Sequence, residues 1–329
     1  MEADKTSYRP FEYLDRMEGN NHIVLLYDNS KYADLIIARY LFNGLKKGES
    51  CIFFTSDNPK KVRKRLTVEG INADSLRIFQ IERDNKNKPE ASDTRVLNIR
   101  GGNDPDGRGG ILRISFDGDV IDGKGILGDD DPLNKYYAYG LRNSFGIGFD
   151  PLTGQLWDTE NGQSTNDEIN LVQPGFNSGW RVIQGPSSLK ADFDKNDLED
   201  FGGKGSYRDP EFDWFDTVAP TSVLFFNSDK LGDRYENDLF IGSVKNGTLY
   251  HFELAENRSQ LDLNGPLADK IADNSSELKD VTFANKLGVI TDLEVGPDGY
   301  LYVLSDFRRD GTIFRISPTD YMTNTTKNE

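Results

Sequence analysis

Residues 139–170, YGLRNSFGIGFDPLTGQLWDTENGQSTNDEIN, hold the side chains of this sequence that are best suited to chemistry. An Arg-Asn pair opens the stretch. A D-P-x-x-G turn and a short apolar run then lead into a loop crowded with oxygen-bearing residues. Guanidinium and amide groups bind the carboxylates of an organic anion. Carboxylate, amide and carbonyl oxygens are the ligands that calcium prefers. The stretch therefore predicts a place for a cofactor and a cation.

The strands that must position this stretch are short and separated by turn residues. From about residue 99 onwards, β-type runs alternate with Gly, Asp, Asn and Pro, and no long helical pattern competes with them. The run GFDPLTGQLWDTE resembles VGPDGYLYVLSD, and KNGTLYHFEL resembles RDGTIFRISP. Such repeated strand–turn–strand units are typical of β-propeller blades. We expect about three blades, at 139–183, 219–254 and 289–317, and the last strand of an earlier blade at 111–115.

An alternation of strand and helix patterns precedes this region. The apolar runs HIVLLY, CIFFT and LRIFQI have the length of buried strands, and KYADLIIARYLFNGLKKG has helical spacing. Asp57 or Asn58, followed by Pro59, indicates the start of a second helix, and Gly70 indicates its end. This order predicts a small parallel α/β unit within residues 22–81. The unit has no G-x-x-x-x-G-K-[ST] motif, so nothing in it indicates nucleotide binding.

Charge is unevenly divided along the 329 residues. Residues 1–88 contain 16 Lys and Arg against 13 Asp and Glu, a net charge of +3, whereas the remainder contains 23 against 42, or −19. The total of −16 argues against a nucleic-acid partner, because nucleic-acid phosphates require a basic surface. The asymmetry indicates two units of different origin.

Membrane and export signals are absent from the sequence. It has no run of about 18 apolar residues that could span a bilayer, and its first residues lack the apolar segment of a signal peptide. We therefore expect a cytoplasmic protein without membrane contact. The single cysteine, Cys51, allows no intrachain disulfide, so any metal site must use other ligand types.

Six ordered motifs within residues 99–318 carry a resemblance to a known family. They are GGILRISFDG, YAYGLRNSFGIGFDPLTGQLWDTENG, NDEINLVQPGFNSGW, VAPTSVLFFNSD, NDLFIGSVKNGTLYHFEL and GPDGYLYVLSD. Together they resemble the soluble quinoprotein sugar dehydrogenases, the glucose/sorbosone dehydrogenase family. The resemblance implies a six-bladed propeller that holds pyrroloquinoline quinone (PQQ) and calcium near its axis. It also implies oxidation of aldose sugars at the anomeric carbon.

The resemblance assigns cofactor-binding roles to three residues. Arg142 and Asn143 match the family's cofactor-proximal Arg-Asn pair, and Lys245 in IGSVKNGTL matches a lysine that faces the cofactor. The alternative for Arg142 is a turn arginine packed against an aromatic ring. The alternative for Lys245 is an ordinary hairpin lysine, and the sequence leaves both alternatives open.

Two metal positions follow from the same resemblance. The backbone carbonyls of Gly162 and Gln163 match those that reach the cofactor's calcium, although Gln163 replaces the family's usual proline. Asp167, Glu168 and the backbone of Ser178 match a second, structural calcium site of some relatives. A solvated acidic turn is the alternative for this second position.

The sequence departs from the family at the residues that perform catalysis. The family's catalytic base is a histidine on an early blade. The only histidines here are His22, in the α/β unit, and His251, where strand alternation predicts a half-exposed edge residue. The family's R-x-R-D pattern, whose arginines clamp the quinone, is replaced by Val289-Ile290-Thr291-Asp292. Losing two charge-assisted partners weakens cofactor binding by about 1.5–3 kcal/mol per hydrogen bond. We therefore assign no catalytic residue.

A second resemblance concerns the N-terminal region. Residues 11–83, with GNNHIVLLYD, ADLIIARYLFNGLKKGES and VRKRLTVEGI, resemble the front half of the methanogen/methylotroph sensory (MEDS) domain. The expected fold class is thus multidomain, α/β plus all-β, with about three to four blades of a six-bladed-type propeller. The expected domains are a truncated MEDS-like unit at 1–83, a linker at 84–98, a propeller without its N-terminal blades at 99–318 and a tail at 319–329.

The sequence leaves three functions open. The first is a PQQ-dependent aldose sugar dehydrogenase-like protein fused to a sensory-type domain, with activity impaired because the catalytic histidine and the paired arginines are absent. The second is a non-catalytic sensor or interaction protein that binds calcium or a small ligand such as a sugar. The third is a fusion of two truncated genes. Open blade edges leave backbone groups unpaired, so we expect either that a second copy or a partner chain covers them or that the partial propeller is unstable alone.

Overall fold

The computed structural model of the chain describes residues 30–48, 52–55, 58–68, 70–72, 76–80, 98–101, 107–115, 118–307 and 310–318. The chain divides into two compact units, Met1–Lys88 and Pro89–Glu329, and the division falls within the segment that the sequence predicts as a linker. In the described ranges, no helix has both the length and the apolar character needed to cross a membrane.

The first unit combines two helices with two parallel strands. Its elements are α2 (Ser30–Lys46), β1 (Ile52–Thr55), α3 (Pro59–Val68) and β2 (Arg77–Gln80). Asn58 caps α3, because its Oδ1 accepts a hydrogen bond from the Lys60 N–H at 2.9 Å. Val62 and Leu66 of α3 pack with Ala38 and Leu41 of α2 in one buried cluster. The parallel pairing of β1 and β2 confirms the predicted α/β pattern, while the predicted strand HIVLLY lies outside the described residues.

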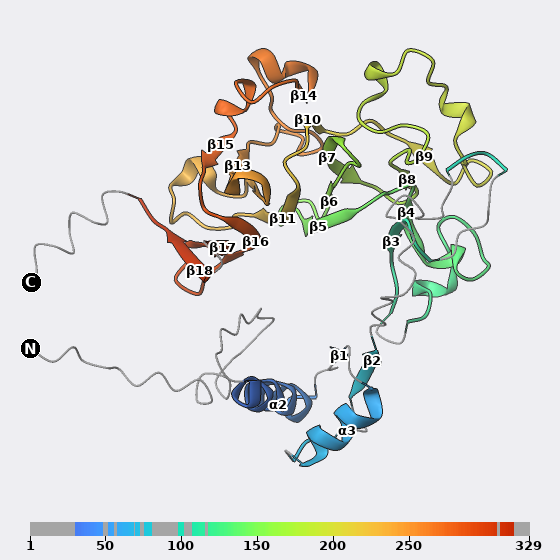
Figure 1. Cartoon of the computed structure of the whole chain (residues 1–329). Coiled ribbons are helices and arrows are strands. Elements are labelled where there is room, and N and C mark those ends of the chain that lie inside the picture. Colours follow the sequence, from blue (N-terminus) through green and yellow to red (C-terminus); the bar gives the residue numbers. More distant parts are fainter. Residues whose placement is uncertain are drawn as a thin grey trace, which may run out of the picture. The chain divides into compact units, whose positions relative to one another are not determined.

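The described residues of the second unit form four sheets (Figure 1). The first sheet contains β3 (Gly110–Leu112), β4 (Tyr136–Tyr139), β8 (Phe176–Asn177) and β9 (Ser206–Tyr207). The second contains β5 (Ser144–Phe149), β6 (Leu156–Glu160), β7 (Thr165–Val172), β10 (Phe212–Asp216) and β14 (Ile271–Ala272). The third contains β11 (Pro220–Phe225), β12 (Leu239–Ser243), β13 (Leu249–Phe252) and β15 (Thr282–Ala284). The fourth contains β16 (Val289–Val295), β17 (Leu301–Phe307) and β18 (Asp310–Ile316).

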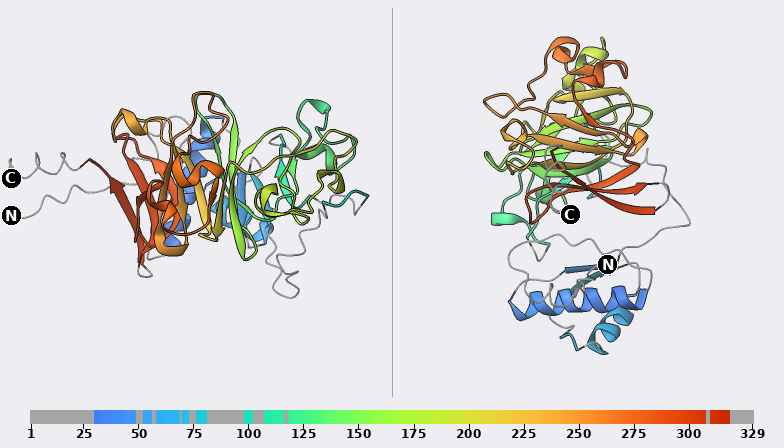
Figure 2. Two further views of the ribbon diagram at one scale, coloured as in Figure 1. Left: turned by 90° about the horizontal axis from the view of Figure 1, so that it is seen from above. Right: turned by 90° about the vertical axis from the view of Figure 1, so that its left-hand side faces the viewer.

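The sheets of this unit stand face to face, and Figure 2 shows them side by side from above. β5 packs against β11, and β11 packs against β16. The first of these contacts is close because Gly146 faces β11, where an added Cβ would lie 2.0 Å from the Thr221 carbonyl oxygen. The sheets follow one another without closing into a ring. The mostly-β architecture is therefore confirmed, and the number of blades stays a prediction.

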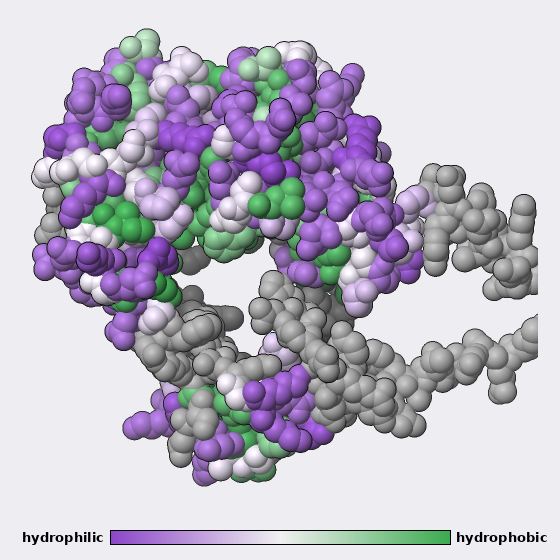
Figure 3. Space-filling view, turned by 180° about the vertical axis from the view of Figure 1, so that it is seen from behind, coloured by the Kyte–Doolittle hydropathy of each residue, from purple (hydrophilic) through white to green (hydrophobic). Residues whose placement is uncertain are grey.

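Apolar side chains fill the spaces between successive sheets. The cluster between the second and third sheets is rich in aromatic rings, among them Trp157, Phe212, Trp214 and Phe252. Burying each such side chain contributes about 1.5–3 kcal/mol, so these faces supply most of the stability of the unit. The outer surface is different: seen from behind, it shows mostly hydrophilic residues with small, separate apolar areas (Figure 3).

The prediction for His251 is wrong. This residue is buried, its Nε2 lies 2.9 Å from Asp238 Oδ2, and its ring packs edge-on against Tyr235. The physical reason is the position of β13. This strand lies between β12 and β15 in the third sheet, so it is not an edge strand. The sequence pattern alone predicted that it would be one.

Candidate cofactor and cation site

Arg142 and Asn143 lie beside the loop that follows β6. The antiparallel pairing of β5 with β6 brings the two segments together, and the Asn161 N–H donates to the Asn143 carbonyl at 2.9 Å. Arg142 Nη1 donates to the Asn161 carbonyl at 2.6 Å, and its guanidinium lies 5.7 Å from the centre of the Trp180 ring. Arg142 Nε is buried and has no hydrogen-bond partner within the described residues. The Asn143 side chain is exposed.

Asp167 fixes the loop that contains Gly162. Its Oδ1 accepts a hydrogen bond from the Gly162 N–H at 2.8 Å, and its Oδ2 accepts from the N–H groups of Val218 and Ala219 at 2.6 and 2.7 Å. Three donors converge on one buried carboxylate, so this side chain is fully used in joining two loops. An added Cβ at Gly162 would lie 2.0 Å from the Thr165 carbonyl oxygen, so only glycine fits this turn.

Lys245 belongs to the same network. It begins a 3₁₀ turn, Lys245–Gly247, between β12 and β13, and its backbone N–H donates to the Val218 carbonyl at 3.0 Å. Its exposed Nζ donates to Thr217 Oγ1. Through Asp167 and the 217–219 loop, the structure brings together Arg142, Gly162 and Lys245, which the sequence predicts as one site.

Glu168 lies on the other face of β7. Adjacent residues of a strand point to opposite faces, and the register pairs Glu168 with Glu160 on β6 and with Asp213 on β10. Ser178 Oγ donates to Glu160 at 2.6 Å and lies 3.3 Å from Glu168 Oε2, while the Gly185 N–H donates to Glu168 Oε1 at 2.7 Å. The structure thus places the Ser178 hydroxyl, rather than the predicted backbone group, beside Glu168 and separates both from Asp167, so the second calcium site stays a prediction.

Asp158 completes a group of buried carboxyls that the sequence analysis missed. We call Asp158, Glu160, Glu168 and Asp213 the carboxyl cluster, and all four side chains are buried. Ser144 and Asn170 lie beside Asp158, yet neither of its carboxyl oxygens accepts a hydrogen bond of normal geometry, and Asp213 Oδ2 also has no partner. Alternation within LWDTE was the signal that could have revealed the cluster, because it places Asp158 and Glu160 on one face.

Burial controls the protonation of the carboxyl cluster. Removal from water raises the pKa of Asp158 to about 7 and that of Asp213 to about 7. Burial, reinforced by the neighbouring carboxyl of Asp158, raises the pKa of Glu160, and burial with the charge of Glu160 raises that of Glu168 well above its ordinary value. Near neutral pH these groups are therefore ready to hold protons, or to exchange them for a cation.

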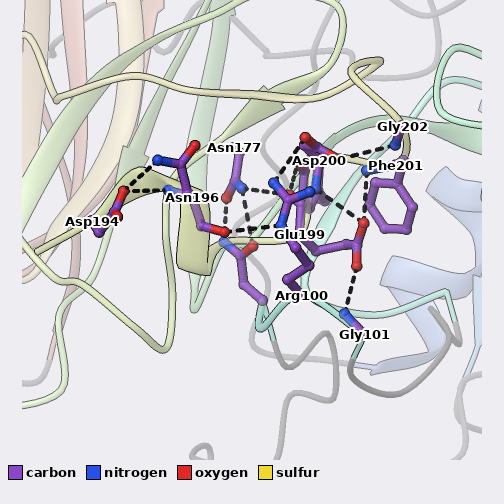
Figure 4. A network of polar contacts seen from close by, with 11 residues as sticks. Arg100, Gly101, Asn177, Asp194, Asn196, Glu199, Asp200, Phe201 and Gly202 are labelled. Carbon is purple, nitrogen blue, oxygen red and sulfur yellow. Dashed lines mark hydrogen bonds and ion pairs between the residues drawn. The ribbon is translucent and has the colours of Figure 1, made fainter.

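A network of polar contacts surrounds Asn177 of β8, the residue that precedes Ser178 (Figure 4). Asn177 Nδ2 donates to Asn98 Oδ1 at 3.0 Å and to the Glu199 carbonyl at 3.3 Å. Around this pair, Arg100 bonds Asp200 at 2.9 Å, and the Gly101 N–H donates to Glu199 Oε2 at 3.0 Å. Because Ser178 follows Asn177 directly, these contacts hold its hydroxyl over the carboxyl cluster.

The oxygen atoms of the candidate site are better suited to binding a calcium ion than its cationic groups are to binding a quinone cofactor. Within the described residues, the carbonyls of Gly162 and Gln163 accept no hydrogen bond, and the carboxyl cluster contains oxygens without partners. Both are ligand types that calcium prefers. In the described ranges no three His, Cys, Asp or Glu side chains stand close enough to hold a metal by themselves, so carbonyl or water ligands would have to complete either site.

The strand that faces the loops from the fourth sheet supplies no positive charge. At the positions of the family's paired arginines, β16 carries Val289, which is half-buried, and Thr291, whose hydroxyl lies 3.3 Å from the Leu304 carbonyl. Among the residues that the motif comparison matched on these loops and on β16, Arg142 and Lys245 are therefore the two cations that could bind an anionic cofactor.

Part of the chain is similar in sequence to curated sugar dehydrogenases. The chain is 28% identical over 238 residues to the aldose sugar dehydrogenase YliI of Escherichia coli (strain K12), covering 71% of this chain and 55% of that protein. It is 26% identical over 194 residues to quinoprotein glucose dehydrogenase B of Acinetobacter calcoaceticus, covering 44% of this chain and 40% of that protein. The chain thus spans about half the length of these relatives, or less.

Solved structures show similarity over the same region. The apo-form of the Escherichia coli soluble aldose sugar dehydrogenase is 27% identical, with a TM-score of 0.47, and the match covers 64% of this chain and 55% of that one. The PQQ-bound aldose sugar dehydrogenase of Streptomyces coelicolor is 22% identical, with a TM-score of 0.43, covering 64% and 52%. The glucose/sorbosone dehydrogenase family model matches residues 103–315, more than half of the sequence. The chain therefore belongs to the glucose/sorbosone dehydrogenase family.

Proposed function

We propose that this protein is an aldose-dehydrogenase-type quinoprotein that binds calcium and, weakly, PQQ, and that its oxidation of sugars at the anomeric carbon is impaired. The observation that carries the proposal is the Asp167 network, which joins Arg142, the Gly162 loop and Lys245 into one polar site. Bound PQQ would supply the hydride acceptor for sugar oxidation.

The roles of the chain's own residues follow from their contacts. Arg142 and Lys245 would attract the carboxylates of the cofactor, and the carbonyls of Gly162 and Gln163 would bind its calcium. The chain has only two histidines, and His251 is held in the core by Asp238, so it is not available to take a proton from a substrate. We therefore expect binding without efficient turnover.

Trp180 offers a direct assay for this proposal. It is the tryptophan that lies against the Arg142 guanidinium, and it is 5% exposed, whereas Trp157 and Trp214 are fully buried. Titration of the full chain with PQQ and Ca²⁺ should quench Trp180 fluorescence saturably, and ultrafiltration should retain PQQ with the protein. R142A should weaken binding about tenfold, which corresponds to one charge-assisted contact.

The matched control is R113A, because Arg113 makes only a long contact of 3.5 Å with the exposed Asp122. This variant should bind PQQ like the unaltered chain, and W180F should lose the quenching but retain PQQ. Absence of retained PQQ with and without Ca²⁺ would refute cofactor binding. Dye-linked glucose oxidation at rates typical of dehydrogenases, about 1–1,000 per second, would refute the impaired activity.

The second candidate is a non-catalytic calcium-binding sensor, and the carboxyl cluster favours it. Unpartnered oxygens of Asp158 and Asp213 lie on the same face as Glu160 and Glu168, and among the described residues the charge of Arg142 opposes only the rise in the pKa of Glu160. If this is the function, Ca²⁺ should raise the thermal midpoint at pH 8 whether or not PQQ binds. E168Q should abolish that rise, whereas E253Q, at an exposed side chain, should preserve it.

A further inference from the structure

A row of apolar side chains on β5 lies open to solvent. Phe145, Ile147 and Phe149 are 59%, 51% and 67% exposed, and Leu152 in the following turn is 62% exposed. We call these four residues the β5 patch. Large apolar side chains exposed together on one strand are uncommon in monomeric proteins and mark interaction surfaces.

Other side chains cover the strand next to β5 in the second sheet, so the exposed apolar surface at this end of the sheet is confined to the β5 patch. Phe149 pairs across the strands with Leu156, yet Leu156 is only 5% exposed because it packs with Leu141 and Phe176 near the first sheet. On its opposite face, β5 is closed by β11 through Gly146. The cover over the second sheet therefore stops between β6 and β5.

The form of β5 indicates how a partner would approach. β5 is the last strand of its sheet, so one edge has no partner strand among the described residues, but its register with β6 is broken by a bulge between Ser144 and Gly146. Bulges disfavour the addition of a further strand to an edge. A partner therefore packs on the exposed face, as one sheet packs on another at a spacing of about 10 Å.

The sequence of β5 is self-complementary. Residues 145–149 read FGIGF in both directions, so a two-fold axis at Ile147 places Phe145 of one copy opposite Phe149 of the other. The far end of the row of sheets exposes less apolar surface, because the exposed positions of β16 are Thr291 and Glu294 and the exposed large apolar side chain of β18 is Ile313, at 43%. Contact between like ends therefore buries more apolar surface than contact between unlike ends.

We infer that the β5 patch is the contact surface for a second copy of this chain, packed face to face about a two-fold axis at Ile147. The patch exposes roughly 450 Å² per copy, or about 900 Å² for the pair, which is at the low end for specific interfaces. The dimer is therefore weak and depends on concentration.

Sedimentation velocity of the full chain over a range from about 1 to 200 μM tests this inference directly, since weak interfaces dissociate in this range. The unaltered chain should shift from monomer to dimer, and I147E should remain monomeric at the highest concentration. The matched control is L189E, because Leu189 is similarly exposed, at 46%, on the turn Ser187–Leu189. It should dimerise like the unaltered chain, and circular dichroism should show that both variants are folded.

A crosslinking experiment distinguishes the two-fold arrangement from other occupants of the patch. In a C51S background, which removes the only cysteine, I147C should form dimers with a short bismaleimide, and L189C should not. A monomer at all concentrations, a dimer that I147E leaves intact, or crosslinks from position 147 to a second class of protein would each overturn the inference. Burial of the patch by the chain's own N-terminal unit would give a monomer in which the reagent fails to label I147C, and this also overturns it.

Discussion

Asp167 and Glu168 are neighbours on β7, yet they lie in opposite electrostatic environments. Asp167 accepts three backbone N–H groups at 2.6–2.8 Å on the face toward the third sheet. Glu168 lies on the other face among three further carboxyls, with one backbone donor at 2.7 Å. Burial raises the pKa of both; three backbone N–H donors oppose this rise at Asp167, whereas the charge of Glu160 adds to it at Glu168.

The difference shows that burial alone does not decide what an acidic residue does. With converging donors, a carboxylate stays charged and holds loops in place. Without them, and beside other carboxyls, it needs a proton or a cation. One face of β7 therefore carries Asp167, which holds two loops together, and the other carries Glu168, part of a cluster that needs protons or a cation. Each role can be tested by substituting an acidic residue on that face.

The largest effect is expected from D167A. This substitution leaves the N–H groups of Gly162, Val218 and Ala219 without an acceptor, so the free energy of unfolding should fall by about 3 kcal/mol or more. Urea denaturation at pH 7 measures this change. The control is D209A, because Asp209 also accepts a backbone N–H, from Ser187 at 2.6 Å, but is exposed. A loss at D209A as large as that at D167A would contradict the comparison.

An effect of the opposite sign is expected from D158N. The pKa of Asp158 is raised to about 7 in the folded chain, so the folded state keeps a proton that the unfolded chain loses from about pH 4 upwards. This term therefore lowers the free energy of unfolding as the pH rises from 4 to 7, and it levels off above. D158N removes the ionisable group, so it should stabilise the chain by about 3–4 kcal/mol at pH 8 and by about 1 kcal/mol or less at pH 4.5.

Urea titrations at the two pH values measure the effect of D158N. The matched comparison is D167N, which places an amide against N–H donors and should destabilise the chain at both values. If D158N lowered the stability at pH 8, Asp158 would have donors or a cation that compensate its charge, and the contrast between the faces would fail.

The smallest effect is expected from K245A. Lys245 contributes an exposed ammonium group to the Asp167 side of the site, where water screens it. The free energy of unfolding should change by less than about 0.5 kcal/mol, while PQQ retention should fall. A stability loss above about 1.5 kcal/mol, measured by the same denaturation, would mean that Lys245 supports the loops together with Asp167.

The sequence patterns predicted which segments form the site more reliably than they predicted which residues contact one another. The strand runs predicted a mostly-β region at 99–318, and the family match at 103–315 lies within it. The grouping of Arg142, Gly162 and Lys245 followed from motifs and is assembled in the structure. The pairing of Asp167 with Glu168 at one metal position was expected from their adjacency along the chain, but strand alternation separates them.

The residues that were misjudged are those whose surroundings come from distant segments. His251 was placed at an edge because its strand was considered without β15, which follows some thirty residues later and covers it. The sequence pattern did not indicate a role for Asp158, because its neighbours in the cluster come from β7 and β10. Local alternation cannot show which strands become neighbours, since that depends on pairing over long sequence separations.

The sequence by itself determined the family, the order of the strands and the set of oxygen-rich residues near the loops, because these depend on local spacing and residue type. Only the tertiary structure decided that Asp167 joins two loops and that four carboxyls meet on one buried face. It also decided that the face of β5 stays uncovered. The physical reason is that burial, and with it the cost of a charge or of an exposed apolar side chain, is created by the segments that pack on a residue.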